Sequence, residues 1–454
     1  MKLDERAIKL GPTRREFLKA AATSAVGLGL LRLGWGSGAH GAPVGPRDLV
    51  LWHWETPPHR VTAYDRLLER FRQETGIVIR QVPIAFPEYH TKILTAAPAR
   101  TLPDLIFVNP PQFMLLLSND LAVPLDDMFA ELHGKVRFFS PYRDYEFQGK
   151  QWGVPLFGVS WPLTYRRDLH LAAGFVGAPA TWGDLLSRAE KMHGPDLPGF
   201  TLPISTKGNY GNQVVWGFLR TNGARIVVGA PGKEKVVFNS RETIETYKFL
   251  VELARFTGPG AETADWASTE LLVRTGRVQT LIYTGSPIGD IADKNPDLAR
   301  RYAQAPVPRP SREHKHANTG YARAAMITRD AQRRGTVAAA KEWLRWITQP
   351  ENNAEFLLAN PGLFMPVNHE VVKAKIWLGH PFNREYKPIV HALTEAMKHI
   401  SVQGFEDGAR SPKAAAIEGS FMTARVLQRI VLEKEPVEQA VAWGHREYEK
   451  ILGS

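Results

Sequence analysis

Three short motifs have residue types that catalytic, metal or cofactor sites use. Asp126 and Asp127 form a carboxylate pair of the kind that cleaves glycosidic bonds, but the apolar residues directly after them favour a helix cap. His314 and His316 could bind a metal ion, yet the polar stretch around them indicates an exposed loop. Residues 36–41 match G-x-G-x-x-G, with no strand before them. The sequence therefore predicts no catalytic residue, no metal site and no cofactor.

Polar and aromatic side chains come directly after two predicted strands, residues 49–52 and 105–108. In open α/β sheets, ligands bind beyond the carboxyl ends of the strands. We therefore expect a small-molecule site at these two positions. The residues concerned are Trp54, Glu55, Asn109 and Gln112.

The elements that must position these side chains alternate between strand and helix. Apolar residues at helical spacing occupy 61–71, Gly76 ends this helix, and residues 77–82 form the next predicted strand. A second helix at 89–97 leads to the strand at 105–108. This alternation predicts an α/β fold with a parallel, doubly wound sheet.

Later segments keep the α/β character. Thr181 and Ser240 are predicted helix N-caps, and strand-like runs lie at 278–283 and 324–328. Beyond about residue 336 the pattern is mostly helical, with a stop at Pro350. The last two predicted helices lie around residues 412–432 and 436–452.

The N-terminus resembles a twin-arginine (Tat) signal peptide. Residues 13–19 read Thr-Arg-Arg-Glu-Phe-Leu-Lys and precede an apolar run at 20–31, with a possible cleavage site within 39–42. Arg32 ends the apolar run before it reaches the roughly 20 residues that a membrane span needs. We expect residues 1–42 to direct export to the periplasm through the Tat machinery.

Composition narrows the class of protein further. The 454 residues include 57 Lys and Arg against 46 Asp and Glu, a formal net charge of +11. These positive charges are scattered as short pairs, which does not favour nucleic-acid binding. The chain has no cysteine, so disulfides, thiolate metal sites and a lipid-bearing cysteine are excluded. A soluble, exported and monomeric protein is expected.

Ten short motifs occur in an order that resembles the family 1 extracellular solute-binding proteins of ABC importers. The best-known members bind maltose, other oligosaccharides and glycerol phosphate compounds. The motifs are Leu-Trp-His-Trp at 51–54, Phe-Arg-Gln-Glu-Thr-Gly-Ile at 71–77, Leu-Pro-Asp-Leu-Ile-Phe at 102–107, Val-Pro-Leu-Asp-Asp at 123–127, Gly-Lys-Gln-Trp-Gly-Val-Pro at 149–155, Tyr-Arg-Arg-Asp-Leu at 165–169, Pro-Ala-Thr-Trp at 179–182, Trp-Gly-Phe-Leu at 216–219, Phe-Asn-Ser at 238–240 and Gly-Arg-Val at 276–278.

The resemblance implies a periplasmic binding protein fold with two lobes and several crossovers. One lobe would hold residues 43–157 and 308–360, and the other would hold 158–307 and 361–454. Such proteins close about a hinge around a small ligand and deliver it to the transmembrane subunits of an ABC permease.

The resemblance also implies a set of ligand contacts. A sugar presents apolar ring faces and hydroxyl groups, so its site combines aromatic planes with amides or carboxylates. Of the aromatic residues, Trp54, Trp161 and Tyr321 are predicted on loops, whereas Trp52, Trp182 and Trp343 are predicted in the core. The full set is Trp54, Glu55, Tyr89, Asn109, Gln112, Ser160, Trp161, Asn209, Tyr210, Trp216, Tyr283, Gly285, Ser286, Asn318, Gly320 and Tyr321.

The chain departs from the sugar-binding pattern of this family at two positions. Thr-Gly-Tyr stands at 319–321 where members often carry Gly-Gly-Trp, and Gly-Ser-Pro stands at 285–287 where they often carry Gly-Pro-Trp. Fewer tryptophans would suit a smaller or more polar ligand, such as a polyol or a glycerophosphodiester. Two other functions stay open: a binding protein that serves a sensor, and an exported glycosidase with a carboxylate pair.

Overall fold

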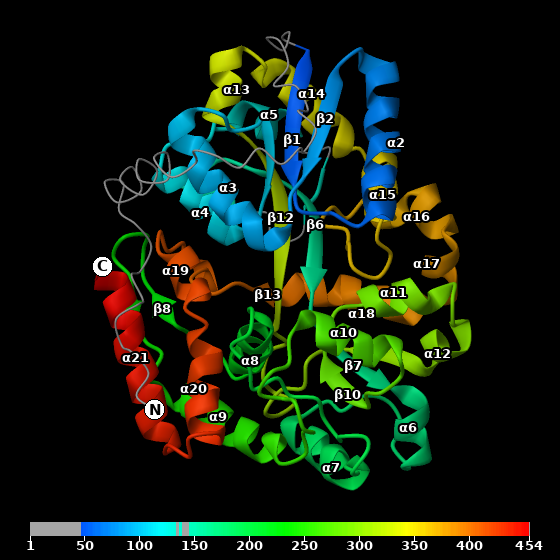
Figure 1. The fold of residues 1–454 in the computed structure, drawn as a ribbon, viewed down its shortest axis with the longest axis vertical. Coiled ribbons are helices and arrows are strands. Elements are labelled where there is room, and N and C mark those ends of the chain that lie inside the picture. Colours follow the sequence, from blue (N-terminus) through cyan, green and yellow to red (C-terminus); the bar gives the residue numbers. More distant parts are fainter. Residues whose placement is uncertain (1–46, 133–135, 139–144, 454) are drawn as a thin grey trace, which may run out of the picture.

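The computed structural model describes residues 47–132, 136–138 and 145–453. Two lobes lie one above the other in Figure 1, and strands β6 and β12 run between them. The expected Tat signal, its cleavage region and the glycine motif at 36–41 lie outside the described residues.

The upper lobe is built on a six-stranded mixed sheet in the order β13-β12-β3-β1-β2, with β6 paired to β12. The first three strands are parallel, as the sequence predicts. However, β12 runs antiparallel to both β3 and β6, so the expectation of a purely parallel sheet is wrong here. The strands are β1 (Asp48–His53), β2 (Val78–Pro83), β3 (Leu105–Val108), β6 (Val154–Ser160), β12 (Asn318–Ile327) and β13 (Ile400–Ser401).

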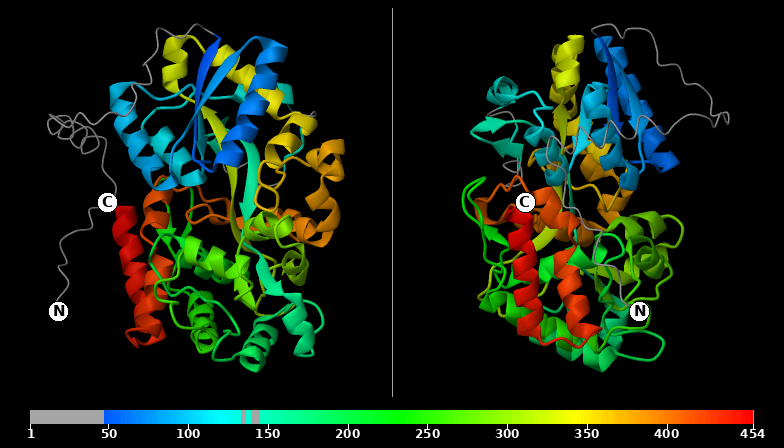
Figure 2. Two further views of the ribbon diagram at one scale, coloured as in Figure 1. Left: turned by 45° about the vertical axis from the view of Figure 1, so that its right-hand side comes forward. Right: turned by 60° about the vertical axis from the view of Figure 1, so that its left-hand side comes forward.

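Helices flank this sheet on both faces (Figures 1 and 2). The first helix, α2, buries Tyr64, Leu67, Leu68 and Phe71 at the predicted spacing, and Gly76 ends it with a left-handed φ of 71°. The helices around the sheet are α2 (Pro58–Thr75), α3 (Phe86–Ala99), α4 (Pro110–Ser118), α5 (Asp126–Leu132), α13 (Arg329–Arg334), α14 (Val337–Ile347) and α15 (Pro350–Leu357).

The lower lobe contains a smaller sheet in the order β10-β7-β11, in which both pairings are antiparallel. The strands are β7 (Leu163–Arg166), β10 (Thr280–Ile282) and β11 (Tyr302–Ala305). Two short hairpins complete the strands: β4 (Glu146–Phe147) with β5 (Lys150–Gln151), and β8 (Val227–Val228) with β9 (Lys235–Val236).

Sequence signals place several helices of the lower half correctly. Thr181 accepts a hydrogen bond from the Asp184 amide, and Ser240 accepts one from the Thr243 amide, so both predicted N-caps are confirmed. The helices before residue 305 are α6 (Arg167–Ala172), α7 (Trp182–Met192), α8 (Tyr210–Thr221), α9 (Arg241–Ala254), α10 (Trp266–Arg274), α11 (Ser286–Ala292) and α12 (Pro296–Arg301).

The C-terminal segment is more broken than the sequence indicates. The helix expected at 412–432 is two helices, because Phe421 takes a left-handed φ of 50° after Gly419 and Ser420. Pro350 follows the end of α14, as predicted, but it also begins α15. The remaining elements are η2 (Val371–Lys373), α16 (Lys375–Gly379), α17 (Pro381–Glu385), α18 (Lys387–Ala396), η3 (Met397–His399), η4 (Glu406–Gly408), α19 (Ala414–Gly419), α20 (Met422–Val431) and α21 (Val437–Gly453).

The apolar core runs through both lobes. Trp52, Trp182 and Trp343 are all buried in it, as their positions in regular elements predict. Within the described residues, no helix combines the length and the apolar character needed to cross a membrane.

Candidate functional site

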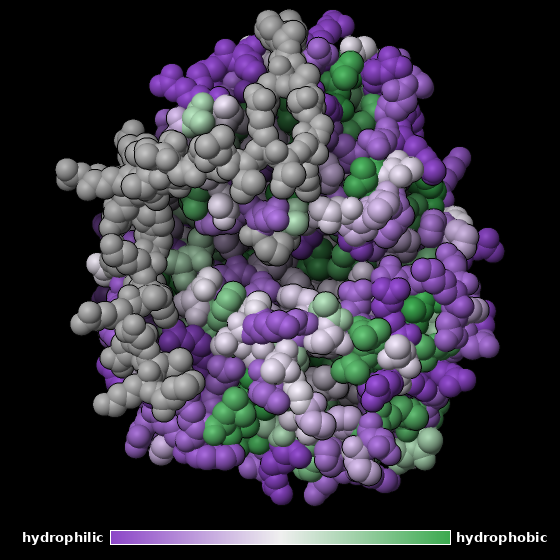
Figure 3. Space-filling view, viewed as in Figure 1, coloured by the Kyte–Doolittle hydropathy of each residue, from purple (hydrophilic) through white to green (hydrophobic). Residues whose placement is uncertain are grey.

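Strand β12 organises the candidate site, because alternate residues of a strand point to opposite faces. Thr319, Tyr321 and Arg323 share one face of β12, and Val159 and Phe157 of β6 lie opposite Tyr321 and Arg323 on that face. A register irregularity follows Arg323, as is common where a strand directs a side chain into a site. This face leads from the lower lobe to the upper one, and Figure 3 shows the surface recessed where the two lobes meet.

The upper part of the site holds a charged cluster against a tryptophan. Arg323 lies with its guanidinium carbon 4.9 Å from the ring centroid of Trp54. Its Nη1 is 3.5 Å from Glu55 Oε1, while Arg60 Nη1 donates to Glu55 Oε2 at 2.8 Å. Glu55 is buried, and a buried carboxylate needs charged partners. The guanidinium groups of Arg60 and Arg323 provide them. Burial lowers the pKa of Arg323.

The upper cluster faces helix α10 of the lower lobe. Trp266 and Glu270 lie four residues apart on this helix and therefore share one side of it. Burial, followed by the nearby charge of Asp290, raises the pKa of Glu270, and the positive charge of Arg60 opposes this shift. Charged groups from both lobes thus act on one another across the site.

The lower part of the site is a group of four aromatic rings. Trp266 lies at their centre, with ring centroids 4.5 Å from Tyr210, 5.5 Å from Trp161 and 5.5 Å from Tyr283. The indole N–H of Trp266 donates to Asn209 Oδ1 at 2.7 Å, which fixes the plane of the ring. Such a group offers flat apolar surface with few rotatable bonds.

A buried hydrogen-bond network forms the floor between the two parts. Tyr321 donates its hydroxyl to Glu418, and Gln213 Nε2 donates to Glu418 Oε1 at 2.7 Å. Thr319 donates to Gln213 Oε1 at 2.5 Å. Burial raises the pKa of Glu418, although these donors oppose the shift. The network joins β12 to α8 and α19, and the Tyr321 ring meets Trp161 edge-on at 5.4 Å.

Two nitrogen atoms along this face have no hydrogen-bond partner among the described residues. They are the indole Nε1 of Trp161 and the Nε of Arg323, and both atoms are buried. A buried N–H group without a partner costs about 1–3 kcal/mol. Their positions on either side of Tyr321 therefore suit a ligand that brings hydrogen-bond acceptors.

Three predicted tyrosines use their hydroxyls within the fold. Tyr89 donates to the carbonyls of Trp52 and Phe107, at 3.0 and 2.9 Å, and so ties β1 to β3. Its ring still meets Trp54 edge-on at 5.1 Å. The hydroxyl of Tyr210 donates to the carbonyl of Ile282, and that of Tyr283 donates to the carbonyl of Trp266. The rings of these tyrosines pack around the site, while their hydroxyls donate to backbone carbonyls of the fold.

Three other predicted residues point away from the aromatic face. Ser160 pairs with Gly320, and Asn318 lies two residues earlier on the same strand, so strand alternation puts all three on the opposite face of the sheet. A side chain on Gly320 would approach the Val159 carbonyl to 2.5 Å. The expectation that Tyr321 lies on a loop is wrong, because β12 begins at Asn318.

The remaining predicted residues are divided between the site's edge and the packing of the fold. Gln112 accepts from the Asn109 amide at 3.0 Å, so this pair caps α4. Trp216, in the middle of α8, donates its indole N–H to the Ser401 carbonyl at 3.1 Å. Gly285 approaches the backbone of Gly362 closely. Ser286 is buried at the start of α11, with its amide donating to Thr284.

Sequence reasoning missed five residues of this arrangement. Four of them come from helices or strand positions with no binding motif, and their partners lie up to 268 positions away in the chain. Trp266 carried a sequence signal. It directly follows Asp265, the N-cap of α10, and therefore lies where a loop joins a helix, a position that often carries binding residues. The missed residues are Arg60, Gln213, Trp266, Arg323 and Glu418.

The motifs considered for catalysis or metal binding lie elsewhere. Asp126 and Asp127 occupy the first turn of α5, as expected for helix-starting residues, and Asp127 pairs with Lys341 at 2.5 Å. His314 and His316 lie in the loop before β12. No group of three or more potential metal ligands occurs within the described part of the chain.

Comparison with known proteins finds a family model and a relative that match most of this chain. The family model for bacterial extracellular solute-binding proteins matches residues 57–354. YcjN of Escherichia coli strain K12, named as a periplasmic-binding protein of an ABC transporter, is 20% identical over 419 residues, which cover 89% of this chain and 93% of YcjN.

Solved structures share the two-lobed fold. A solute-binding protein of Thermotoga lettingae bound to α-D-tagatose has a TM-score of 0.70 and 19% identity, covering 89% of this chain and all of that one. A solute-binding protein of Agrobacterium radiobacter K84 in complex with ribitol has a TM-score of 0.73 and 17% identity, covering 90% of this chain and all of that one. The chain therefore belongs to the bacterial extracellular solute-binding protein family.

Proposed function

We propose that this protein captures a small carbohydrate-like ligand between its two lobes and delivers it to an ABC permease. The ligand class is a sugar, an oligosaccharide or a polyol. The observation that carries the proposal is the aromatic group around Trp266, placed beside the unpartnered N–H groups of Trp161 and Arg323. Aromatic planes stack on sugar C–H faces, and N–H groups donate to sugar hydroxyl oxygens.

The relatives support the same ligand class. The matched structures include complexes with α-D-tagatose and with ribitol, a ketose and a polyol. YcjN is named as part of an ABC transporter. By analogy, we assign the lobes to residues 43–157 with 308–360 and residues 158–307 with 361–454, with residues 1–42 as a Tat signal for export to the periplasm as a monomer.

The proposed contacts differ from the sequence-based set. Trp161, Trp266 and Arg323 would contact the ligand, with Trp54, Glu55 and Asn209 holding them in place. The hinge motion would bring α10 towards Arg60 as the ligand is enclosed. Of the predicted residues, Ser160, Asn318 and Gly320 would lie outside the site.

Thermal unfolding of residues 43–454 with a panel of sugars and polyols tests this proposal. A ligand at about 100 times its dissociation constant adds roughly 2.7 kcal/mol of stability. We expect a stabilising shift with at least one monosaccharide, oligosaccharide or polyol. A panel in which none of these compounds shifts the transition would contradict the proposed ligand class.

One observation favours a second candidate, a glycerophosphodiester. The two guanidinium groups of Arg60 and Arg323 share the single carboxylate of Glu55, and a phosphodiester could pair with the surplus positive charge. Including glycerophosphodiesters in the panel separates the candidates, since only this ligand would lose affinity steeply with added salt. Uptake by a strain lacking the gene then distinguishes delivery to a permease from service to a sensor.

A further inference from the structure

A cavity of about 940 Å³ lies at the other end of helix α8 from the aromatic group. Its walls come from the β4–β5 hairpin, the last turn of α8, the loop at 314–317 and the segments 398–402 and 405–410. We name it the hinge-side cavity. Because α8 spans Tyr210–Thr221, and an α-helix rises about 1.5 Å per residue, roughly 15–18 Å of helix separates it from the aromatic group.

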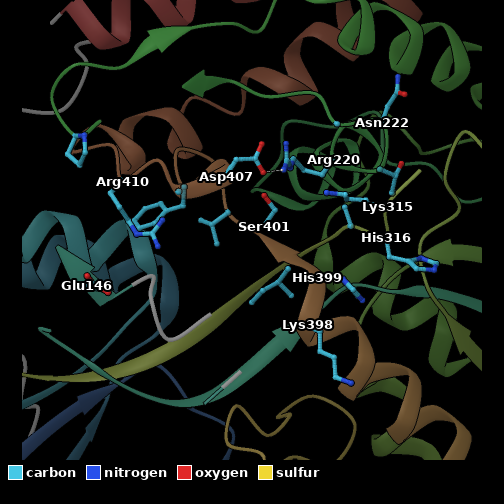
Figure 4. Close-up of a pocket in the computed structure, with 18 of the residues that line it drawn as sticks. Glu146, Arg220, Asn222, Lys315, His316, Lys398, His399, Ser401, Asp407 and Arg410 are labelled. Atoms are coloured by element: carbon cyan, nitrogen blue, oxygen red, sulfur yellow. Dashed lines mark hydrogen bonds and ion pairs between the residues drawn. The ribbon is translucent and has the colours of Figure 1, made fainter. Parts of the chain in front are cut away.

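The lining of the hinge-side cavity is rich in positive charge. Four lysine or arginine side chains face two carboxylates, a formal surplus of two positive charges before any histidine is counted. Arg220 is already paired with Asp407 at 2.8 Å, and Lys398 is paired with Glu395 outside the lining. Lys315 has no ion pair among the described residues. Figure 4 shows Lys315 beside the Arg220–Asp407 pair.

Two histidines of the cavity lie side by side. The ring centroids of His316 and His399 are 5.8 Å apart, and they come from the loop before β12 and from η3. Burial is the main cause that lowers the pKa of both rings. A neutral imidazole still donates one N–H, so this pair can bind an anionic oxygen without being charged.

We propose that the hinge-side cavity binds a small solute that carries a phosphate group, with Lys315, Arg220 and the His316–His399 pair as its ligands. A phosphate monoester carries about −1.5 to −2 charges at pH 7, and a lining with more lysine and arginine side chains than carboxylates favours such an anion. The volume lies within the roughly 300–1,000 Å³ of small-molecule pockets, so the body of the solute also fits.

This site is separate from the proposed carbohydrate site. The aromatic group contributes no residue to the lining of the cavity, and none of Trp161, Trp266 or Arg323 borders it. The histidine motif at 314–316, predicted to be an exposed loop, forms one wall of this cavity.

Calorimetric titration of residues 43–454 with inorganic phosphate tests the proposal. We expect saturable binding of one phosphate with a dissociation constant below about 10 mM. Lys315→Glu reverses a charge inside the cavity and should weaken phosphate binding by at least about tenfold. Lys294→Glu is the matched control, because Lys294 is exposed at the end of α11, outside the lining.

In a double variant, His316→Asn with His399→Asn, phosphate binding should also weaken, because the amide N–H groups no longer lie where the imidazole N–H groups were. The proposal fails if phosphate does not saturate the protein, if Lys315→Glu and Lys294→Glu weaken it equally, or if phosphate is displaced by the ligand of the aromatic group. Sugar-induced thermal shifts measured on the same variants report the carbohydrate site separately, so failure of one proposal does not imply failure of the other.

Discussion

The two ends of helix α8 face opposite kinds of chemistry. Its first turn carries Tyr210 and Gln213, which contact an aromatic ring and a buried hydrogen-bond network. Its last turn carries Arg220, which faces the hinge-side cavity. A cation suits the carboxyl end of a helix, where the backbone dipoles are negative. One helix therefore separates a site for apolar ring faces from a site for an anion.

Buried glutamates accompany both ends of α8, and they differ in how well they are hydrogen-bonded. Glu418, near the first turn, accepts from Tyr321 and Gln213. Glu406, near the last turn, accepts from the Ile226 amide at 3.1 Å, and its Oε2 has no partner within the described residues. Burial raises the pKa of both carboxyl groups, but Tyr321 and Gln213 donate to Glu418 at the aromatic end, whereas Glu406 at the cationic end has an oxygen without a partner among the described residues.

The largest effect is expected from Glu406→Gln. Burial raises the pKa of Glu406 from its ordinary value of 4.5 to about 7. A raised carboxyl pKa gives stability that is fully present below pH 4.5 and is lost as the pH rises through about 7. This loss is about 3 kcal/mol for the wild type, and Glu406→Gln should abolish it.

Urea unfolding between pH 4.5 and 8 measures this difference. Exposed Glu262 provides the control, and Glu262→Gln should leave the pH dependence of the wild type unchanged. Parallel curves for the wild type and Glu406→Gln would show that Glu406 titrates normally.

A smaller effect on stability, but a large one on binding, is expected from Trp161→Ala. Losing this ring removes stacking surface and an indole N–H donor, so affinity for the sugar found by thermal screening should fall about 100-fold. Affinity for phosphate should not change. Trp443→Ala is the matched control, because Trp443 of α21 packs under Arg429 of α20, and the sugar affinity of this variant should equal that of the wild type. Calorimetry with both ligands checks the result.

The smallest effect is expected from Tyr321→Phe. Removing the hydroxyl takes a donor from buried Glu418 and should destabilise the protein by about 1–2 kcal/mol. Tyr64→Phe offers a contrast, because the buried Tyr64 hydroxyl has no partner among the described residues. That variant should be neutral or stabilised in the same urea titration. Equal losses of stability in Tyr321→Phe and Tyr64→Phe would mean that the hydrogen bond from Tyr321 to Glu418 does not stabilise the fold.

The sequence predicts the parts of the fold that depend on local patterns. Helix α2, the parallel strands β1 to β3 and the N-caps at Thr181 and Ser240 all follow from spacing and capping residues. The start of β12 does not, because Asn318 and Gly320, on either side of Thr319, have little strand propensity. Its direction depends on pairing with residues more than 150 positions away, which no local pattern records.

The candidate site, too, could be predicted only where it depends on local sequence patterns. Trp54 and Glu55 could be predicted because they follow a strand end. Ser160 and Gly320 were included through resemblance, but strand alternation turns them to the other face. Gln213 and Glu418 meet only because α8 and α19 each bring a side chain to Tyr321 of β12, although the two residues are 205 positions apart. Contacts made by packing distant elements had no signal in the sequence.

A crystal structure of residues 43–454 with the sugar or polyol selected by thermal screening tests the central claim most directly. We expect the ligand between the two lobes, stacked on Trp161 or Trp266 and accepting hydrogen bonds from the Trp161 indole and from Arg323. A ligand bound in the hinge-side cavity, or one that contacts neither tryptophan, would contradict the claim.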